Sequence, residues 1–380
     1  MIEEIEIAGD CWRFLSMERR SFVLTEKERL ERILRHEEVD RPACICPGGM
    51  MNMITADLMD ACGITWPEAH TDAEMMAKLA LASFEHGCFE NVGVPFCMTV
   101  EAEAMGAEVT MGTKNFEPHV TAYAANSVSQ WRTLASVDMN QGRAKVVLDA
   151  IRILKGMNLS VPIIGNIVGP VSTASSVVDS VPFYKELRKN REDAHAFMTF
   201  VTKQLIEFAN AMIEAGADVI AISDPSGTGE ILGPKLFEEY AVKYLNMLLD
   251  GIESKKTGTI VHICGQMRSV YKQIGMVHAG ALSFDAIVPM KEARAHLGDR
   301  VLMGNVSTFA LEFGNEDRIE KLTKFCVKSG SDIISPACGL GTKAPLANVQ
   351  AILKTLKKNK AAFDQIETIT EISEEEWKHA

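Results

Sequence analysis

The sequence predicts an α/β protein, a (β/α)8 TIM barrel with an N-terminal helical extension and an insertion after the second strand. Short apolar segments alternate with long helical segments along the 380 residues, and six of the eight apolar segments end in polar or metal-binding residues. Such alternation implies parallel strands joined by crossover helices. Eight units over roughly 340 residues match the size of a barrel with insertions.

The segments expected to form strands are short, apolar and bounded by turn residues: ACICPGG from Ala43, FENVGVP from Phe89, VPIIGNIVG from Val161, ADVIAISDP from Ala217, TIVHICG from Thr259, ALSFDAI from Ala281, VLMGNVS from Val301 and DIISPACG from Asp332. Helical periodicity lies between and after them, for example in 194–215, 316–329 and 346–362.

One catalytic barrel domain is expected over residues 25–365. Thr25 and Glu28 form a capping box that begins a helix, and the Asp40-Arg41-Pro42 segment is expected to stop it. Residues 1–24 are then an N-terminal extension, and 366–380 an acidic tail. The insertion is expected between the second and third strands, over residues 101–143, with a hairpin around residues 107–113.

A doubly wound open sheet would give the same alternation, so the strand ends decide between the two folds. In a barrel the carboxyl ends of all strands converge at one mouth, where the chemistry of that fold resides. In an open sheet they would be spread along an edge. The polar ends that favour the barrel are Asn166, Asp224, His262 with Cys264, Asp285, Asn305 and Cys338.

The composition predicts a soluble cytoplasmic protein. The chain is 47% hydrophobic and 24% charged, with a net charge of −12, which argues against broad nucleic-acid binding. No apolar run approaches the roughly 20 residues that span a bilayer, and the acidic N-terminus does not resemble a secretory signal. Nine cysteines, an odd number, are expected to be reduced, which is compatible with an anaerobic cell.

The sharpest local motif is His262-Ile263-Cys264, because residues i and i+2 of a strand point to the same side. Barrel closure would bring Cys338, after the last strand, to the same mouth. One imidazole and two thiolates suit Zn(II) and leave one coordination position open, as in catalytic sites. The competing interpretation is a buried histidine and two buried cysteines without a metal.

The charge of such a site indicates its chemistry. Two thiolates and a neutral imidazole cancel the +2 charge of zinc, so the site would activate water poorly. It would instead hold a substrate thiol as a thiolate and leave its sulfur nucleophilic. The expected reaction is alkyl transfer to sulfur.

Several segments resemble the methylcobalamin:coenzyme M methyltransferase group of the uroporphyrinogen decarboxylase superfamily. They occur in the same order and cover roughly residues 25–363: RPACICPGGMMN, GVPFCMTVEAEAMGA, GNIVGPVSTAS, ADVIAISDPSGTGEILGP, VHICG, LMGNVST and SPACG. The resemblance implies a TIM barrel with His262, Cys264 and Cys338 as zinc ligands and catalytic centre. It also implies that a methyl group moves from a methylated corrinoid (methylcobalamin), usually on a small partner protein, to a thiol such as coenzyme M.

Other functions stay open at this point. A related enzyme could work at the donor end and demethylate a small methylated substrate onto a corrinoid protein. The decarboxylase branch fits less well, because its early RPxWxMRQAGR segment, whose arginines receive substrate carboxylates, is replaced here by RPACICPGGMM. A metal-binding or corrinoid-binding module without turnover is the alternative from a different class.

Two acidic positions are predicted to contact substrate. Asp224, at a predicted strand end, could orient substrate or a zinc ligand, or it could cap the helix that follows. Glu101 could be a transient fourth zinc ligand that the thiol displaces, as could Glu103. A solvated face of a helix in the insertion is the alternative for at least one of them.

Two asparagines complete the predicted substrate-binding set. Asn166 and Asn305 could bond a corrinoid side chain or the acceptor, or they could satisfy loop backbone. Cys44 and Cys46, in contrast, form a Cys-x-Cys pair without an assigned third ligand, and we predict that both are core residues.

Overall fold

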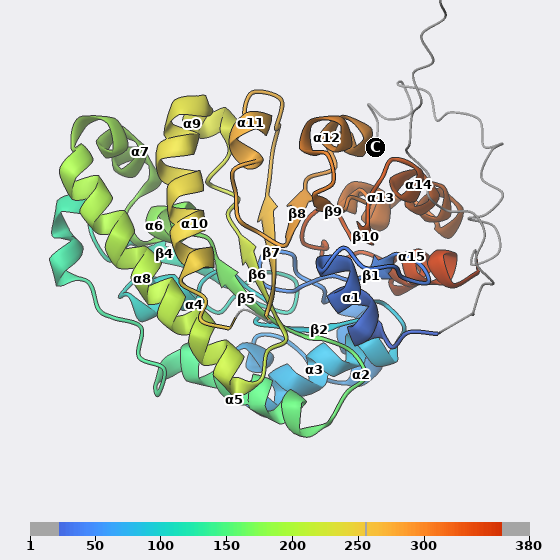
Figure 1. Ribbon diagram of the computed structural model, residues 1–380. Helices are drawn as coiled ribbons and strands as arrows, with labels where there is room; N and C mark the ends of the chain where they lie inside the picture. The colour runs from blue at the N-terminus through green and yellow to red at the C-terminus, as the bar shows by residue number, and fades with distance from the viewer. Residues whose placement is uncertain (1–22, 255–256, 359–380) are drawn as a thin grey trace, which may run out of the picture.

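A computed structural model describes residues 23–254 and 257–358 of the chain. Its centre is an eight-stranded, all-parallel sheet that curls into a barrel, in the order β1-β10-β9-β8-β7-β6-β5-β2 (Figure 1). All eight expected segments supply one strand each: β1 (Ala43–Cys44), β2 (Val92–Val94), β5 (Ile163–Val168), β6 (Val219–Ser223), β7 (Gly258–Ile263), β8 (Ala281–Phe284), β9 (Val301–Met303) and β10 (Ile333–Ile334). The predicted (β/α)8 class is confirmed.

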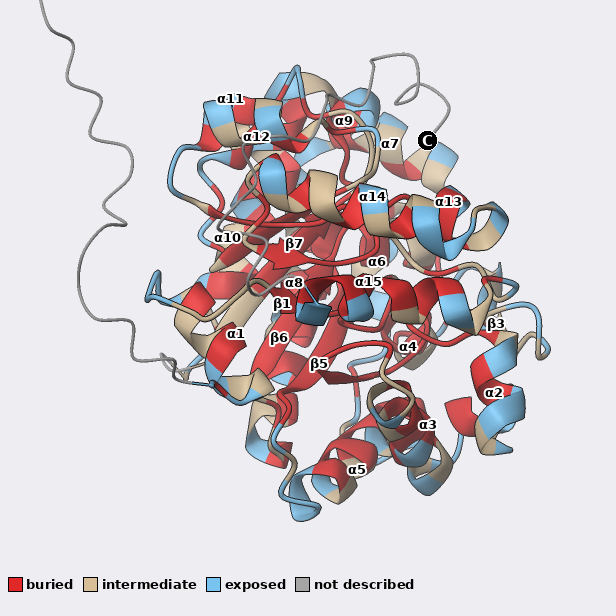
Figure 2. Cartoon of the chain, turned by 90° about the vertical axis from the view of Figure 1, so that its right-hand side faces the viewer, coloured by how far each residue is buried: buried red, intermediate tan, exposed pale blue. Residues whose placement is uncertain are grey.

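Helices form the outer layer, and their exposed faces point away from the buried strands (Figure 2). The α-helices are α1 (Glu26–Leu34), α2 (Ala56–Cys62), α3 (Ala73–Glu85), α4 (Val100–Ala104), α5 (Gly142–Gly156), α6 (Pro170–Val177), α7 (Ser180–Lys189), α8 (Arg191–Ala215), α9 (Gly229–Leu236), α10 (Lys243–Asp250), α11 (Tyr271–Ile274), α12 (Met290–Leu297), α13 (Thr308–Phe313), α14 (Glu316–Lys328) and α15 (Leu346–Lys358). Shorter 3-10 turns are η1 (Glu68–His70) and η2 (Val128–Thr133), and η3 (Phe237–Val242) is a π-helix.

The register of the parallel sheet sets the ends of three strands at one level. All residues of β5 and β6 are buried, as expected for strands covered on both faces. Ser223 pairs with His262, and His262 pairs with Ser283. The chemistry-bearing residues of β6, β7 and β8 therefore lie side by side at the carboxyl end of the barrel.

The two edge strands of the curled sheet, β1 and β2, form no ladder with each other. Side chains help to join them and so complete the barrel. The side-chain amide of Asn91 replaces a backbone peptide group in pairing with Cys46. Its Oδ1 accepts from Cys46 N (2.9 Å), and its Nδ2 donates to Cys46 O (2.8 Å). Glu90 adds a second link, since its Oε2 accepts from Cys44 N (3.0 Å) and its own N donates to Cys44 O (2.7 Å). The β1–β2 seam therefore depends on two polar side chains.

The expected insertion between β2 and β5 contains an antiparallel hairpin, β3 (Glu108–Thr110) and β4 (His119–Ala122). Its first strand lies in the predicted 107–113 segment, and the second begins later than predicted. The tip of the hairpin is held over the carboxyl end of the barrel, because Asn115 O accepts from Thr342 Oγ1 (3.2 Å) and Lys114 pairs with Asp60.

The capping box is confirmed, but the helix that it begins is shorter than predicted. Glu28 N donates to Thr25 Oγ1, and the Glu28 carboxylate accepts from Thr25 N. The helix ends at Leu34 rather than at Asp40-Arg41-Pro42, because His36 adopts a left-handed φ of 57° and the chain turns back through Glu37 N to Arg32 O (2.9 Å).

Two expected terminal segments fall largely outside the described residues. Of the N-terminal extension, 1–22 lie outside, and the acidic tail 366–380 lies outside entirely. In the described part of the chain, no helix combines the length and apolarity needed to cross a membrane.

Candidate metal centre

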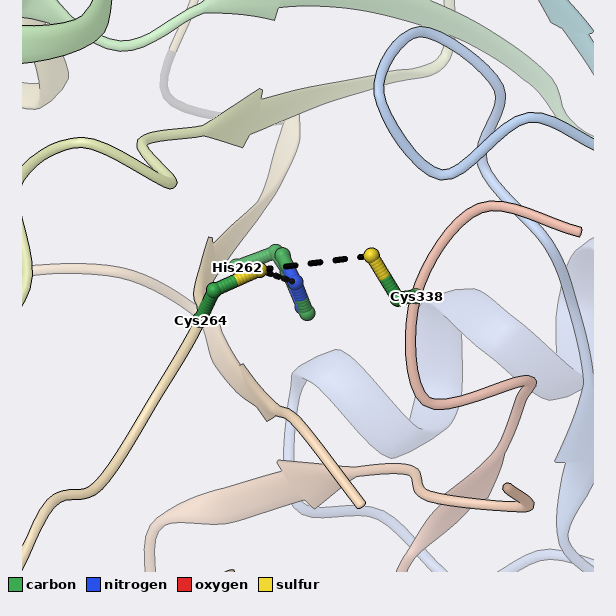
Figure 3. Close-up of side chains that lie close together, drawn as sticks. All are labelled: His262, Cys264 and Cys338. Carbon is green, nitrogen blue, oxygen red and sulfur yellow. Dashed lines mark hydrogen bonds between the residues drawn. The ribbon is translucent and has the colours of Figure 1, made fainter. Parts of the chain in front are cut away.

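Three predicted ligands converge at the carboxyl end of the barrel. His262 lies in β7, Cys264 follows that strand directly, and Cys338 lies in the loop after β10. His262 Nε2 is 3.2 Å from Cys264 Sγ, and the two sulfurs are 4.0 Å apart (Figure 3). All three ligand atoms lie within 4.8 Å of one another, and no other such grouping occurs among the described residues.

These separations fit zinc. A tetrahedral ion with Zn–S bonds of about 2.3 Å and Zn–N bonds of about 2.0 Å requires ligand atoms about 3.5–3.8 Å apart. The observed 3.2 Å and 4.0 Å bracket that range, and the third pair of ligand atoms lies within 4.8 Å, so a modest contraction around the ion would complete the geometry. With three protein ligands, a tetrahedral ion keeps one position for a substrate.

The two thiols are electrostatically unequal. The contact between the two thiols, with His262 nearby, lowers the pKa of Cys338 to about 5. The same contact and burial raise the pKa of Cys264. A bound cation would favour the ionised form of both sulfurs, because metal binding requires deprotonated thiols.

Ser283 orients the imidazole. Its Oγ lies 3.0 Å from His262 Nδ1, and it occupies the adjacent position on β8. When Nδ1–H donates to this oxygen, the Nε2 lone pair faces the two sulfurs, which is the tautomer that a metal ligand needs. Sequence reasoning missed Ser283; its signal was its place two residues before the strand-end Asp285 on the neighbouring strand.

Glu117, another residue that sequence reasoning missed, reaches this end of the barrel from the inserted hairpin. Burial, with Cys338 nearby, raises the pKa of Glu117 to about 7, and the nearby Asn52 amide opposes the rise. The loop that carries Asn52 packs tightly on the metal centre, since a Cβ on Gly339 would lie 2.4 Å from Met50 O. The sequence could not predict the position of this carboxyl group near Cys338, because the position depends on how the inserted hairpin folds back onto the barrel.

Asp224 is buried and binds the N-terminus of α6. Its carboxylate accepts from Ser172 N (2.7 Å), Ser172 Oγ (2.6 Å) and Val171 N (3.2 Å). Desolvation raises the pKa of Asp224 despite these bonds. The alternative that Asp224 caps the following helix is wrong, because Thr228 caps α9, and the substrate contact of Asp224 remains a prediction. Asp224 binds α6 instead, because the turn between β5 and α6 passes over the end of β6, where Asp224 lies.

Glu101 is buried in the insertion, close to the end of β5. Its Oε1 accepts from Val168 N (2.8 Å), its Oε2 has no hydrogen-bond partner among the described residues, and burial raises its pKa. It is not among the three converging ligands. Glu103 is partly exposed and pairs with Arg143 (2.5 Å), which agrees with the solvated alternative for one of the two acids.

The two predicted asparagines make backbone contacts. Asn166 Nδ2 donates to Pro47 O (2.6 Å), whereas its buried Oδ1 has no partner among the described residues. Asn305 Nδ2 donates to Asp285 O and Val288 O (both 2.8 Å), which satisfies the loop after β8. Substrate contacts of both remain predictions. Cys44 and Cys46 are buried core thiols, as predicted.

The sequence profile described as "Uroporphyrinogen decarboxylase (URO-D)" matches residues 25–359, nearly the whole described chain. The chain belongs to the uroporphyrinogen decarboxylase family. The predicted family resemblance is therefore confirmed, and the matched region begins at the capping box of α1.

Within this family, methyltransferases of methanogens are similar over their whole length. The methylcobamide:CoM methyltransferase MtaA of Methanosarcina barkeri is 36% identical over 335 residues, which cover 87% of this chain and 96% of the relative. MtbA of Methanosarcina acetivorans is 32% identical, covering 88% and 98%. A solved methyltransferase from Methanosarcina mazei superposes with a TM-score of 0.82 at 35% identity, covering 88% and 99%.

Proposed function

We propose that this family member is a methyltransferase that moves a methyl group from a methylated corrinoid to a thiol, with coenzyme M as the first candidate acceptor and zinc at the metal centre. The observation that carries the proposal is the convergence of His262, Cys264 and Cys338 at the mouth of the barrel. Full-length similarity to two methylcobamide:CoM methyltransferases supports it independently.

The donor set supports thiol chemistry rather than hydrolysis. Zinc held by one imidazole and two thiolates would lower the pKa of an incoming thiol and leave the sulfur nucleophilic. The reaction forms an S–C bond and breaks the Co–C bond, whose electron pair stays on the corrinoid cobalt. Displacement at a methyl carbon develops no oxyanion, so catalysis relies on thiolate formation and positioning.

The protein's own contribution is to orient the ligands and keep the site dry. Ser283 fixes the ring of His262, and Gly339 allows the Cys338 loop to lie against Met50. Glu117 brings a carboxyl group with a raised pKa to the same end of the barrel, where it can exchange a proton with an acidic thiol.

A corrinoid-carrying protein is the proposed partner. A methylcorrinoid must reach the open mouth with its methyl group facing the acceptor thiol. The resemblance supports a donor presented on a small protein, and free methylcobalamin serves as the test substrate.

The experiment is anaerobic spectroscopy of methylcobalamin with the zinc-loaded protein, in which coenzyme M, homocysteine or tetrahydrofolate is added in turn. We expect zinc-dependent loss of the methyl–cobalt absorbance with a thiol. Cys264→Ala should lose stoichiometric zinc and slow transfer by at least about 100-fold, since it removes one of three ligands. Cys62→Ala, at a half-buried cysteine of α2, is the matched control.

Two results would contradict the proposal. If Cys264→Ala retained both zinc and thiol methylation, the assignment of the centre would be wrong. If the zinc-loaded protein demethylated nothing with any acceptor, the reaction would lie at the donor end, and methylated amines, ethers, halides and thiols would be tested with the unmethylated corrinoid protein.

A further inference from the structure

Basic residues line a groove between α7 and α9. Both helices lie at the same end of the molecule as the carboxyl ends of the strands (Figure 1). The groove consists of two cavities that share Arg188, Leu232 and Leu236. The first, of about 360 Å³, is lined by Tyr184, Lys185, Arg188, Lys189, Ile231, Leu232 and Leu236. The second, of about 390 Å³, is lined by Arg188, Arg191, Leu232, Gly233, Pro234, Lys235 and Leu236.

The charge of this groove is opposite to that of the whole chain. The eleven residues that line the two cavities include five basic and no acidic side chains, although the chain holds 51 acidic and 39 basic residues. Arg191 pairs with Glu239. Within the described residues, the other four cations (Lys185, Arg188, Lys189 and Lys235) form no ion pair with an acidic side chain.

Helix ends alone do not account for this concentration. Cations are stabilised at the carboxyl end of a helix, which explains Arg188 and Lys189 in the last turn of α7. Lys185, however, lies in the middle of α7, and the acid beside it, Glu186, is engaged elsewhere, since it accepts from Val128 N (2.8 Å). Four of the five cations of the groove therefore lack a neutralising acidic partner among the described residues.

Its floor is apolar. Leu232 and Leu236 are buried beneath the cations, and Ile231 is 47% exposed at the edge. A left-handed Gly233 (φ of 67°) and Pro234 interrupt α9 here, which opens the helix surface at the second cavity. An apolar floor with a charged rim is typical of a protein-binding surface.

Both walls of the groove are joined to loops at the carboxyl end of the barrel. Tyr184 donates from its hydroxyl to Ser226 O (2.9 Å), in the loop after β6. On the other wall, Glu230 Oε2 accepts from Gln266 N (3.2 Å), two residues after Cys264. A protein seated in the groove would therefore lie at the edge of the mouth.

We propose that the groove docks an acidic segment of the protein that presents the methylcorrinoid, with an apolar side chain of that segment on the leucine floor. This inference rests on the proposed function. Its basis is charge complementarity. This protein carries a net charge of −12 and would repel most acidic partners, but the basic residues of the groove would attract an acidic surface to the edge of the mouth. Unpaired rim cations act mainly on the rate and salt dependence of association.

The test compares a protein-bound donor with a free donor. The double variant Arg188→Glu, Lys189→Glu is assayed with the source organism's own corrinoid-binding protein, loaded with methylcobalamin, and separately with free methylcobalamin. With the protein donor we expect KM to rise about tenfold or more and its salt dependence to flatten, with kcat unchanged. With free methylcobalamin, KM and kcat of the double variant should equal those of the unaltered protein.

Two further variants sharpen the comparison. Lys203→Glu with Lys321→Glu changes the net charge equally on exposed faces of α8 and α14 that line neither cavity, and it should leave KM unchanged. Lys235→Glu, on the opposite wall, should raise KM for the protein donor, and it provides a second reading if the double variant folds poorly.

Three outcomes would overturn the docking proposal: an unchanged KM for the protein donor, an equal effect of the control pair, or an equal rise of KM for free methylcobalamin, which would assign the groove to the corrinoid itself. Failure of the proposed function is distinguishable, because the unaltered protein would then not demethylate free methylcobalamin with any thiol. Calorimetric titration of the corrinoid protein tests docking independently of turnover.

Discussion

His262 illustrates how one residue depends on a neighbour that the motif does not contain. The strand periodicity places His262 and Cys264 on the same side, but it does not orient the imidazole ring. Ser283, at 3.0 Å from Nδ1 on the adjacent strand, supplies that orientation. The affinity of the centre for zinc is thus expected to depend on at least four side chains, the three ligands and Ser283.

Ser283→Ala is expected to weaken zinc affinity by about 10- to 100-fold, because the ring of His262 loses the acceptor for its Nδ1–H. Competition with a chromophoric zinc chelator measures the effect. Ser331→Ala is a matched control, since Ser331 is also buried and its Oγ has no partner among the described residues. Equal affinity in both variants would refute the orienting role of Ser283.

His70 makes a residue-scale prediction about pH. Its ring packs on Trp66 (5.0 Å between centroids), both ring nitrogens lack partners among the described residues, and burial, with Arg143 nearby, lowers its pKa to about 3. The unfolded chain binds a proton near pH 6.5, whereas the folded protein does not. Stability is therefore lost as the pH falls below about 6.5, by about 2 kcal/mol between pH 7 and pH 5.

The variant His70→Phe should remove this part of the pH dependence, because it removes the group that protonates on unfolding. Urea unfolding at pH 7 and pH 5 measures the difference in the free energy of unfolding. His119→Phe, at an exposed histidine of β4, should retain the full dependence. The prediction fails if His70→Phe and the unaltered protein lose equal stability between the two pH values.

At the scale of elements, α6 is attached to the sheet through its N-terminus. Asp224 lies at the end of β6, and its carboxylate accepts three hydrogen bonds from Val171 and Ser172 in the first turn of α6. The helix-end dipole adds to these bonds. One buried acid thus connects two consecutive βα units at the mouth of the barrel.

Asp224→Asn is expected to lower the free energy of unfolding by about 2–3 kcal/mol, because an amide group offers one acceptor and brings its N–H groups against other donors. Asp179→Asn, at the exposed N-terminus of α7, should cost about 0.5 kcal/mol or less, since asparagine caps a helix nearly as well. Chemical denaturation of both variants tests the contrast. Equal losses would mean that the buried contacts of Asp224 add nothing.

At the scale of the whole molecule, the barrel closes between β1 and β2 through two polar side chains and one backbone bond, from Glu90 N to Cys44 O (2.7 Å). The ladder between these two strands is missing, and Asn91 restores two of its hydrogen bonds at Cys46. Glu90 is held in turn by Arg41 and by Arg29 (3.3 Å). Side chains therefore supply most of the hydrogen bonds at this seam, whereas backbone ladders join the other neighbouring strands of the barrel.

Asn91→Ala should lower the free energy of unfolding by about 2–4 kcal/mol, because it leaves the buried N–H and C=O of Cys46 without partners. Asn246 makes the same pair of bonds, to His278 N and Met276 O, at a half-buried position. Asn246→Ala should cost about 1 kcal/mol or less, since water can replace the lost partner. Losses of the same size in both variants would contradict a special role for the seam.

The sequence by itself determined the strand–helix alternation, the positions of all eight strands and the three converging ligands. The strands and the pairing of His262 with Cys264 depend on local physics: apolar runs, capping residues and the strand period of two. The approach of Cys338 follows from closure of the predicted barrel. One error was local, the early end of α1 at a left-handed His36, which hydrophobic periodicity does not encode. The other, the helix that Asp224 binds, arose from a contact between distant residues.

Tertiary structure alone decided which distant side chains support the centre and close the barrel. Ser283, Glu117 and Asn91 act through partners on other elements, and the cationic groove combines two helices separated by β6. Such contacts depend on sheet register, on the path of the inserted hairpin and on side-chain packing. The physical reason is that a hydrogen bond or a charge interaction depends on distance in space, whereas sequence patterns report only neighbours along the chain.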